Sequence, residues 1–326
     1  MTVPRVLATG FAVPPRIMTN DELSTMVDTS DEWIYSHTGI RERRIAADDQ
    51  ATSDLAIDAG RRALERAGVS ADDVDLILVA TSTPDYLGFP ATASLVQSAL
   101  GATKAGAMDV SAACSGFIYA LETARASIAS GASRYVLVIG AEVFSRILDW
   151  TDRNTCILFG DAGAAVLVGP SPESFPAPWF APSLLRSDGS GGPALLRPAG
   201  GTRQPAGTPR ELAVSMDGRR VYAFAITVVK DIILDILARN GLTLDDVDWV
   251  VPHQANVRIV ASAAQRLGLP LERFYLNMER YANTSGASIP LALAEMEEQG
   301  LLKRGQLMVT VGFGAGLSWG ANLFRW

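Results

Sequence analysis

The chain has 326 residues, of which 48% are hydrophobic and 19% are charged, and its formal net charge is −7. This balance argues against a disordered chain, and the length is enough for two domains or two fused halves that each bury a core. No Lys/Arg cluster is interleaved with aromatic residues, so we expect no nucleic-acid partner.

The sequence also favours a cytoplasmic location. Two cysteines, Cys114 and Cys156, are more typical of free thiols in an intracellular protein than of a disulfide framework. Pro14 and Pro15 interrupt the first apolar stretch, so no signal peptide is expected. Residues 305–324 carry no charge but include five Gly, which predicts a strand, a turn and a strand in the core instead of a membrane span.

In chain order, the first clear unit is a helix that ends at Gly68 and leads into an apolar run at 76–81. The helix carries Ala63, Leu64 and Ala67 at helical spacing, and Gly favours a helix stop. The apolar run is continuous, not alternating, which indicates a strand covered on both faces by helices.

This unit returns later in the chain. Residues 64–80 align without gaps to residues 237–253, sharing Leu, Arg, Gly and Asp-Asp-Val-Asp before an apolar run. Two more pairs follow at nearly the same offset: 111–121 with 283–293, and 135–143 with 307–316. Three pairs in order favour two α/β halves related by pseudo-symmetry over chance reuse of a common helix and strand phrase.

Residues 170–210, dense in Pro, Gly and Ser, would join the halves as a linker or excursion. We therefore expect an N-terminal half at 1–170 that carries a nucleophilic cysteine. The C-terminal half, 171–326, would carry a histidine and an asparagine.

Cys114 is the candidate nucleophile. It follows a short apolar strand and small residues, and it precedes a helix with Phe117, Ile118 and Leu121 at core spacing. The N–H groups and dipole of a helix N-terminus favour the thiolate, so we expect the pKa of this thiol to lie below its ordinary ~8.5. The alternative is a buried, inert cysteine, which is the only interpretation for Cys156 in its apolar, strand-like run.

Only His37 and His253 could supply an imidazole. His253 directly follows an apolar strand, at the carboxyl end where open α/β sheets bind ligands. His37 lies in a polar, basic stretch more typical of a surface or a cofactor edge. We therefore interpret His253 as catalytic, with a structural histidine as the alternative.

Asn283 precedes a helix. It is either part of a helix cap with Thr284 and Ser285, or an amide that donates a hydrogen bond to a developing oxyanion. The glycines of GFGAG at 312–316 would let the backbone approach a ligand. This loop lacks the spacing of the known phosphate-binding motifs, so it does not predict a phosphate cradle.

Taken together, six motifs resemble β-ketoacyl-acyl carrier protein synthase III. They are DTSDEWI at 28–34, TGIRERR at 38–44, SAACSGF around Cys114, VPHQANVRI around His253, NTSGAS from Asn283 and the terminal GFGAGLSWG. Their order along the whole chain makes the resemblance specific. It implies an α/β thiolase-like fold with two pseudo-symmetric five-layered (αβαβα) halves, and a homodimer.

The resemblance implies a condensing acyltransferase that initiates fatty acid synthesis. A short acyl-CoA primer would load Cys114, and malonyl-acyl carrier protein would lose CO2 so that its enolate attacks the acyl-enzyme. His253 and Asn283 would hydrogen-bond the malonyl thioester oxygen. Backbone N–H groups of Cys114 and Ala315 would form the oxyanion hole for acyl transfer, and Phe313 would exclude water. Coenzyme A enters as a substrate thioester, and no cofactor or metal is implied.

Binding residues follow by position. The expected CoA and substrate contacts are Thr29, Trp33, His37, Arg153, Asn256, Phe159 and Tyr222. Trp33 and Arg153 would sandwich the adenine, and Asn256 would reach the pantetheine arm. Arg258 and Arg266 would meet the acidic carrier protein. Phe89 would cross the dimer interface and, with Phe313, line the primer pocket.

The rival interpretations are weaker on residue inventory. Elongating synthases need two active-site histidines, and thiolases need a second cysteine near the C-terminal Gly-rich loop. A papain-like hydrolase would need its Cys near the mature N-terminus, and a non-catalytic carrier-binding subunit would not need all three reactive residues. The closest alternative is a relative in specialised metabolism that transfers an acyl group to O or N, which Asn283 disfavours because its amide suits decarboxylation.

Overall fold

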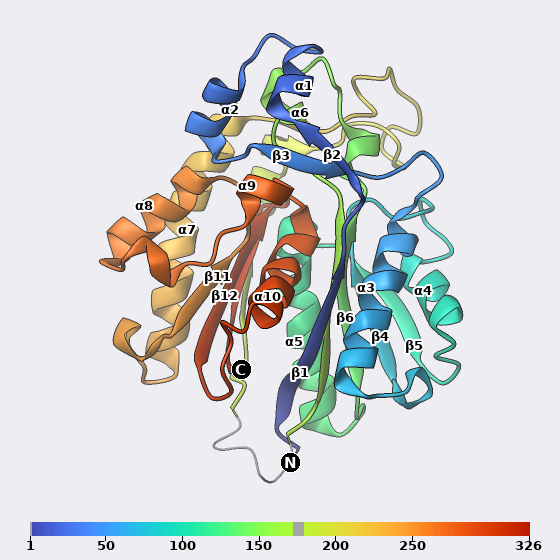
Figure 1. The fold of residues 1–326 in the computed structure, drawn as a ribbon, viewed down its shortest axis with the longest axis vertical. Coiled ribbons are helices and arrows are strands. Elements are labelled where there is room, and N and C mark those ends of the chain that lie inside the picture. Colours follow the sequence, from blue (N-terminus) through green and yellow to red (C-terminus); the bar gives the residue numbers. More distant parts are fainter. Residues whose placement is uncertain (1, 172–178) are drawn as a thin grey trace.

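The computed structural model describes residues 2–171 and 179–326 (Figure 1). Residues 172–178, part of the segment interpreted as a linker, lie outside the described residues. Within the described ranges, no helix combines the length and apolar character that crossing a membrane requires.

The first sheet has five strands in the order β1-β7-β6-β4-β5. Strands β6, β4 and β5 are parallel, whereas β7 is antiparallel to both β6 and β1. Every residue of β6 is buried, as the continuous apolar run indicates for a strand between two helical layers. The strand bounds are Pro4–Ala12 (β1), Leu76–Ala80 (β4), Gly106–Val110 (β5), Val136–Glu142 (β6) and Ala162–Pro170 (β7).

The second sheet repeats this order as β8-β13-β12-β11. Strands β11 and β12 are parallel, whereas β13 is antiparallel to both β12 and β8. Val250 of β11 forms a parallel bridge with Phe274, at the place that β5 occupies in the first sheet. The bounds are Leu184–Ser187 (β8), Trp249–Pro252 (β11), Leu307–Gly314 (β12) and Ser318–Arg325 (β13). Because β8 lies within 170–210, the linker interpretation is wrong for that part of the segment.

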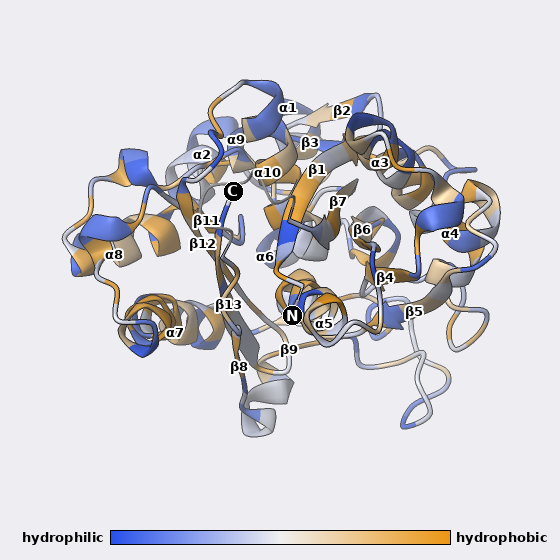
Figure 2. Ribbon diagram, turned by 90° about the horizontal axis from the view of Figure 1, so that it is seen from below, coloured by the Kyte–Doolittle hydropathy of each residue, from blue (hydrophilic) through white to orange (hydrophobic). Residues whose placement is uncertain are grey.

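Helices cover both sheets, and Figures 1 and 2 show the layers in the order helix, sheet, helix, sheet, helix. One outer layer is α3 with α4, and the other is α7 with α8. Helices α5 and α10 lie between the sheets. The bounds are Thr52–Ala67 (α3), Thr92–Leu100 (α4), Gly116–Ser130 (α5), Gly218–Arg239 (α7), Val257–Leu267 (α8) and Ser288–Glu298 (α10). The thiolase-like α/β fold is confirmed, with its five layers spanning the whole molecule.

Smaller elements sit at the end of the sheets where the active-site residues gather. They are Arg16–Thr19 (β2), Asn20–Ser24 (α1), Asp31–Thr38 (α2), Glu42–Ile45 (β3), Arg153–Cys156 (α6), Leu195–Leu196 (β9), Ser215–Met216 (β10) and Met278–Tyr281 (α9). Although Ile34 and Ile40 come early in the chain, they pack in the same core as α7 and α8. Cys156 ends α6 and does not lie in a strand, and it is a buried free thiol.

Two short turns place the ends of the central helices. Ala113–Ser115 leads into α5 and Ser285–Ala287 leads into α10, and Ala113 and Ser285 share the same positive φ of 48°. Each turn packs on the central strand of the opposite half. A Cβ added to Gly140 of β6 would lie 2.1 Å from the carbonyl oxygen of Gly286. The backbone itself therefore fixes how the halves meet.

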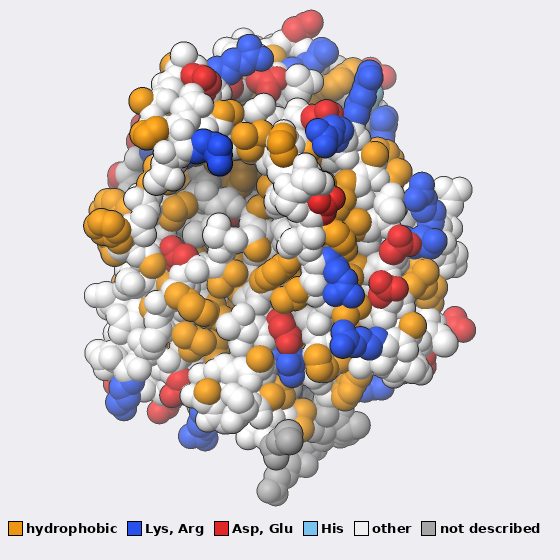
Figure 3. Space-filling model, turned by 180° about the vertical axis from the view of Figure 1, so that it is seen from behind, with side chains coloured by type: hydrophobic (Ala, Val, Ile, Leu, Met, Phe, Trp, Pro, Cys, Tyr) orange, Lys and Arg blue, Asp and Glu red, His pale blue; other side chains and the backbone are white. Residues whose placement is uncertain are grey.

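The surface fits the acidic composition. On the face shown in Figure 3, Lys and Arg side chains are scattered among acidic and apolar ones and form no continuous basic stripe.

Gly140→Ala tests the contact between β6 and the turn. We expect it to lower the free energy of unfolding by about 2 kcal/mol or more, because a methyl group cannot coexist with the Gly286 carbonyl without moving backbone. Gly189→Ala is the control, since its Cβ meets nothing within 4 Å, and we expect a change within about 0.5 kcal/mol. Denaturant unfolding measures both, and equal losses would contradict the analysis.

Candidate active site

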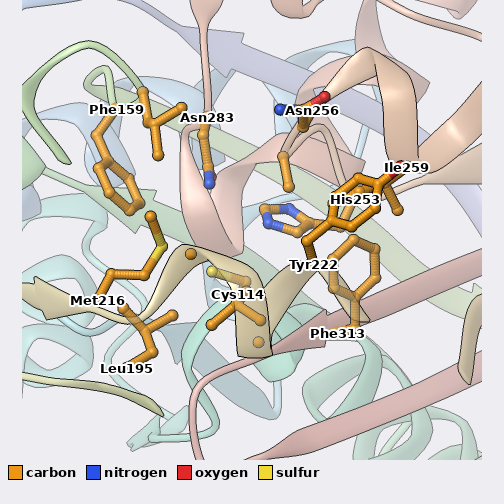
Figure 4. A pocket seen from close by; sticks show the side chains of 15 residues that line it. Cys114, Phe159, Leu195, Met216, Tyr222, His253, Asn256, Ile259, Asn283 and Phe313 are labelled. Carbon is orange, nitrogen blue, oxygen red and sulfur yellow. The ribbon is translucent and has the colours of Figure 1, made fainter. Parts of the chain in front are cut away.

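Cys114, His253 and Asn283 line one cavity of about 160 Å³. Cys114 lies in the turn before α5, and His253 directly follows β11. Asn283 lies just before the turn that leads into α10. In Figure 4 the side chains of all three point toward the same space. The structure thus brings together the three reactive groups that lie far apart in the sequence.

The thiol of Cys114 is 5% exposed. Burial raises its pKa to about 12, and the nearby Glu142 carboxylate acts in the same direction. The prediction of a lowered pKa is therefore wrong. Burial of the thiol, which depends on segments far apart in the sequence, disfavours the charged thiolate.

His253 is 1% exposed, and burial lowers the pKa of its imidazole to about 3. The ring is therefore neutral near pH 7. Its Nδ1 lies 2.7 Å from the hydroxyl oxygen of Ser288, the first residue of α10. Phe313 packs edge-on against the ring, with 5.2 Å between the ring centroids. These contacts hold the imidazole in place at the cavity wall.

Asn283 combines the two interpretations drawn from the sequence. Its side-chain oxygen accepts a hydrogen bond of 2.8 Å from the backbone N–H of Ser285, which is a capping contact. The amide nitrogen consequently faces the cavity, as Figure 4 shows. The side chain of Thr284 makes no such cap on this turn. One amide therefore both closes the turn and offers a donor to a ligand.

Sequence reasoning missed Glu142, which lies at the end of β6 and is fully buried. Its carboxylate accepts hydrogen bonds from the Thr83 hydroxyl at 2.6 Å, from the Ser82 N–H at 3.0 Å and from the Gly286 N–H at 3.4 Å. Burial raises its pKa. It ties the loop after β4 to the turn that carries Asn283. The only available signal was a carboxylate at the end of an apolar run.

An outer cavity of about 950 Å³ adjoins the first and shares Met216, Gly218, Tyr222 and Asn256 with it. Trp33 and His37 line it and are stacked with 4.4 Å between ring centroids. The Arg153 guanidinium lies 4.8 Å from the Trp33 ring centroid. Arg219 and Arg258 add positive charge to the walls. The outer cavity therefore suits a ligand with a flat ring and anionic groups.

A third cavity of about 110 Å³ reaches Cys114 from another side. Ala315 and Phe159 line it, and Phe159 also lines the first cavity. One further expected contact, Asn256, has its side-chain atoms engaged in the fold. Asn256 donates to the His37 carbonyl at 3.0 Å, and its side-chain oxygen caps α8.

Three expected residues, Thr29, Arg266 and Phe89, line none of these three cavities, and Arg258 lines only the outer one. Thr29 precedes the N-cap of α2 and its hydroxyl is buried. Arg258 donates to the carbonyl of Ser36, and Arg266 donates to the carbonyl of Ile226, so both sit on the surface of α8. Phe89 is 89% exposed. Within one chain, Phe89 is therefore not brought to the reactive groups.

Comparison with known proteins decides the family. The models for 3-oxoacyl-[acyl-carrier-protein (ACP)] synthase III and for its C-terminal part match residues 108–189 and 237–326. A relative named beta-ketoacyl-[acyl-carrier-protein] synthase III from Caldanaerobacter subterraneus subsp. tengcongensis is 48% identical, over 98% of this chain and 97% of the relative. The chain belongs to this synthase III family.

Solved structures agree. The synthase III of Thermus thermophilus superposes with a TM-score of 0.92 at 46% identity, covering 98% of both chains. A priming β-ketosynthase from a polyketide biosynthetic pathway has a TM-score of 0.92 at 38% identity, covering 99% of this chain and 96% of the other. As a synthase III, the chain is a condensing enzyme and an acyltransferase that initiates fatty acid synthesis.

The raised pKa of Cys114 predicts how the free enzyme reacts with iodoacetamide. Well below the pKa of a thiol, the thiolate fraction grows about tenfold per pH unit. We therefore expect alkylation of Cys114 to be about tenfold faster at pH 9 than at pH 8, measured by mass spectrometry in a Cys156→Ala background. A rate that levels off between pH 7 and 8 would show a low pKa and contradict the effect of burial.

Proposed function

We propose that the chain transfers a short acyl group from acyl-CoA to Cys114 and condenses it with malonyl-acyl carrier protein. The products are 3-ketoacyl-acyl carrier protein, CoA and CO2. The observation that carries this proposal is the single cavity lined by a thiol, an imidazole and a carboxamide, joined to an outer cavity with aromatic and cationic walls. An acyl-CoA has an adenine ring, phosphates and a narrow pantetheine arm, which fit these two joined cavities.

In the loading step the Cys114 sulfur attacks the acyl carbonyl, the bond from that carbon to the CoA sulfur breaks, and the thiol proton leaves with CoA as its free thiol. The adenine would lie between Trp33 and Arg153, with the Arg153 guanidinium, 4.8 Å from the Trp33 ring centroid, moving aside to admit it, and Tyr222 and Asn256 would border the arm. Backbone N–H groups of Cys114 and Ala315 would bind the tetrahedral oxyanion. Ala315 supports this role because it lines the third cavity together with Cys114.

In the condensation step the malonyl group loses CO2 and its thioester oxygen becomes an enolate oxygen. His253 and Asn283 would donate hydrogen bonds to that oxygen, where negative charge develops. The enolate carbon then attacks the acyl group on Cys114 and releases the sulfur. Phe313 covers one side of His253 and would keep water from protonating the enolate carbon.

The third cavity supports a short primer. Its volume of about 110 Å³ is smaller than a ~150 Å³ cavity that holds benzene. Its walls are largely apolar, from Phe144, Ile147 and Val214. Phe89, 89% exposed, stands with Tyr86 and Leu87 in an exposed apolar loop. We propose that a second copy of the chain covers this loop, in a homodimer that brings Phe89 to the partner's primer pocket.

Carrier protein docking is assigned to Arg258 and Arg266 on α8, whose charges are exposed at the surface. Positive charge at this place suits an acidic partner, although the chain as a whole is acidic. The proposal includes a cytoplasmic location, with which two free cysteines are compatible.

Product analysis tests the function. The chain is incubated with malonyl-acyl carrier protein and a panel of acyl-CoAs, and we expect 3-ketoacyl products with CO2 release, fastest for short primers. Cys114→Ala should abolish condensation, because no other residue can carry the acyl group. Asn283→Ala should slow CO2 release about 100- to 1000-fold while radiolabelled acyl-CoA still labels Cys114. Acyl esters or amides as the only products would overturn the proposal.

The neutral His253 predicts the pH dependence of decarboxylation. Burial lowers the pKa of its imidazole to about 3, so its protonation state stays constant from pH 5 to 8 and changes only in stronger acid. We expect kcat for CO2 release at saturating malonyl-acyl carrier protein to show no inflection near pH 6.5. An inflection there that disappears in His253→Asn but persists in His37→Gln would show an imidazole that titrates normally.

A further inference from the structure

The segment from Asn283 to Ser288 contacts both groups that the proposed function assigns to the enolate oxygen. Asn283 belongs to the segment, and His253 reaches it from the end of β11 through Ser288. All three side chains are buried. The hydrogen bonds inside this segment therefore decide whether each group presents a donor or an acceptor to the cavity.

The backbone fixes the orientation of the Asn283 side-chain amide. The N–H of Ser285 can only donate, so the atom at 2.8 Å from it must be the amide oxygen. The amide nitrogen, with its two protons, is left to face the cavity. Asn283 is thus held as a donor before any substrate binds.

Which ring nitrogen of His253 carries the proton depends on where one hydroxyl proton points. Ser288 Oγ lies 2.7 Å from Nδ1 of His253 and 2.8 Å from the carbonyl oxygen of Ser285. If the hydroxyl donates to Nδ1, the proton of the neutral ring sits on Nε2. If it donates to the carbonyl instead, Nδ1 carries the ring proton and Nε2 presents a lone pair.

One observation and one requirement of the proposed function favour donation to Nδ1 over donation to the Ser285 carbonyl. The carbonyl of Ser285 already accepts the backbone N–H of Ser288, so it does not need the hydroxyl. A lone pair on Nε2 would repel an enolate oxygen that the Asn283 amide attracts, and the two groups would then oppose each other. With Nε2 protonated, both groups donate toward one point in the cavity.

We propose that Ser288 is a positioning residue that fixes the Nε2–H tautomer of His253 by donating its hydroxyl proton to Nδ1. One segment then sets both oxyanion donors: the Ser285 N–H orients the Asn283 amide, and the Ser288 hydroxyl orients the His253 proton. This inference rests on the proposed function, because that function requires His253 to donate.

The tautomer can be observed directly. The chain has two histidines, so His37→Gln leaves His253 as the only one. In a ¹⁵N-histidine sample of that variant, long-range ¹H–¹⁵N correlation distinguishes a protonated Nε2 from a protonated Nδ1. We expect a protonated Nε2 at pH 7. A protonated Nδ1 would overturn the inference, whether or not the enzyme condenses acyl groups.

Ser288→Ala gives the kinetic test. Without the hydroxyl, the ring samples both tautomers, and we expect CO2 release from malonyl-acyl carrier protein to fall about 10-fold or more. That loss should stay below the roughly 100- to 1000-fold expected when an oxyanion donor is removed outright. Labelling of Cys114 by acyl-CoA should change less than about twofold, because His253 donates nothing in that step. Ser288→Thr keeps the hydroxyl and should restore most of the rate.

The matched control is Ser24→Ala, which removes a hydroxyl that contacts a carbonyl three residues earlier, at 2.7 Å, on an exposed helix. It should leave both half-reactions unchanged. If Ser288→Ala slows labelling and CO2 release by the same factor, Ser288 is merely structural and the inference fails. If the unmodified enzyme releases no CO2, the proposed function fails, and the tautomer spectrum still judges the inference separately.

Discussion

The active site depends on the close contact between each central turn and the main strand of the opposite half. Gly140 of β6 has no room for a Cβ beside Gly286, and Gly314 of β12 has none beside Cys114, where an added Cβ would lie 2.8 Å from the existing one. Side chains cannot act as spacers at these places, so the main chain sets the separation. A nucleophile on one half and its donors on the other are consequently held with little freedom, which is what preorganised catalysis requires.

The two halves use one scaffold for different chemistry. In the alignment of 111–121 with 283–293, Cys114 corresponds to Gly286, and Gly116 corresponds to Ser288. Both turns start with the same positive φ, at Ala113 and at Ser285. In the proposed function the first turn carries the nucleophile, whereas the second turn orients Asn283 and leads to Ser288, which contacts His253. The two copies of the turn meet at one cavity, so one backbone conformation serves two functions.

Much of the fold and the position of His253 could be predicted because the sequence signals for them are local. The continuous apolar run at 76–81 predicted β4, and the repeated segments predicted the matching sheets. The carboxyl end of β11 correctly located His253 at a cavity. What could not be predicted depends on partners far apart in sequence.

The pKa of Cys114 is such a case, because its sign follows from how completely distant segments bury the thiol. Glu142 and Ser288 are others, because their meaning appears only when the loop after β4 and the end of β11 are brought to the second turn. A further case is the pair Ile34 and Ile40, which pack in one core with residues of α7 and α8 from the other half. Periodicity shows which residues are covered and does not show what covers them.

The burial that makes the Cys114 thiol a weaker acid also makes the site better suited to stabilise the proposed enolate. Burial holds both the thiol and the imidazole neutral near pH 7, so neither group brings a charge of its own to the proposed reaction. A charged imidazolium would attract the malonyl carboxylate in the ground state as well as the enolate oxygen, and attraction shared by both states does not accelerate decarboxylation. In the proposed function, neutral N–H donors from His253 and Asn283 act at short range, at the thioester oxygen, where charge grows only as CO2 leaves. In a site of low polarity such fixed donors interact more strongly than they would in water. Burial, neutrality and donor direction therefore act together to favour the transition state over the bound substrate.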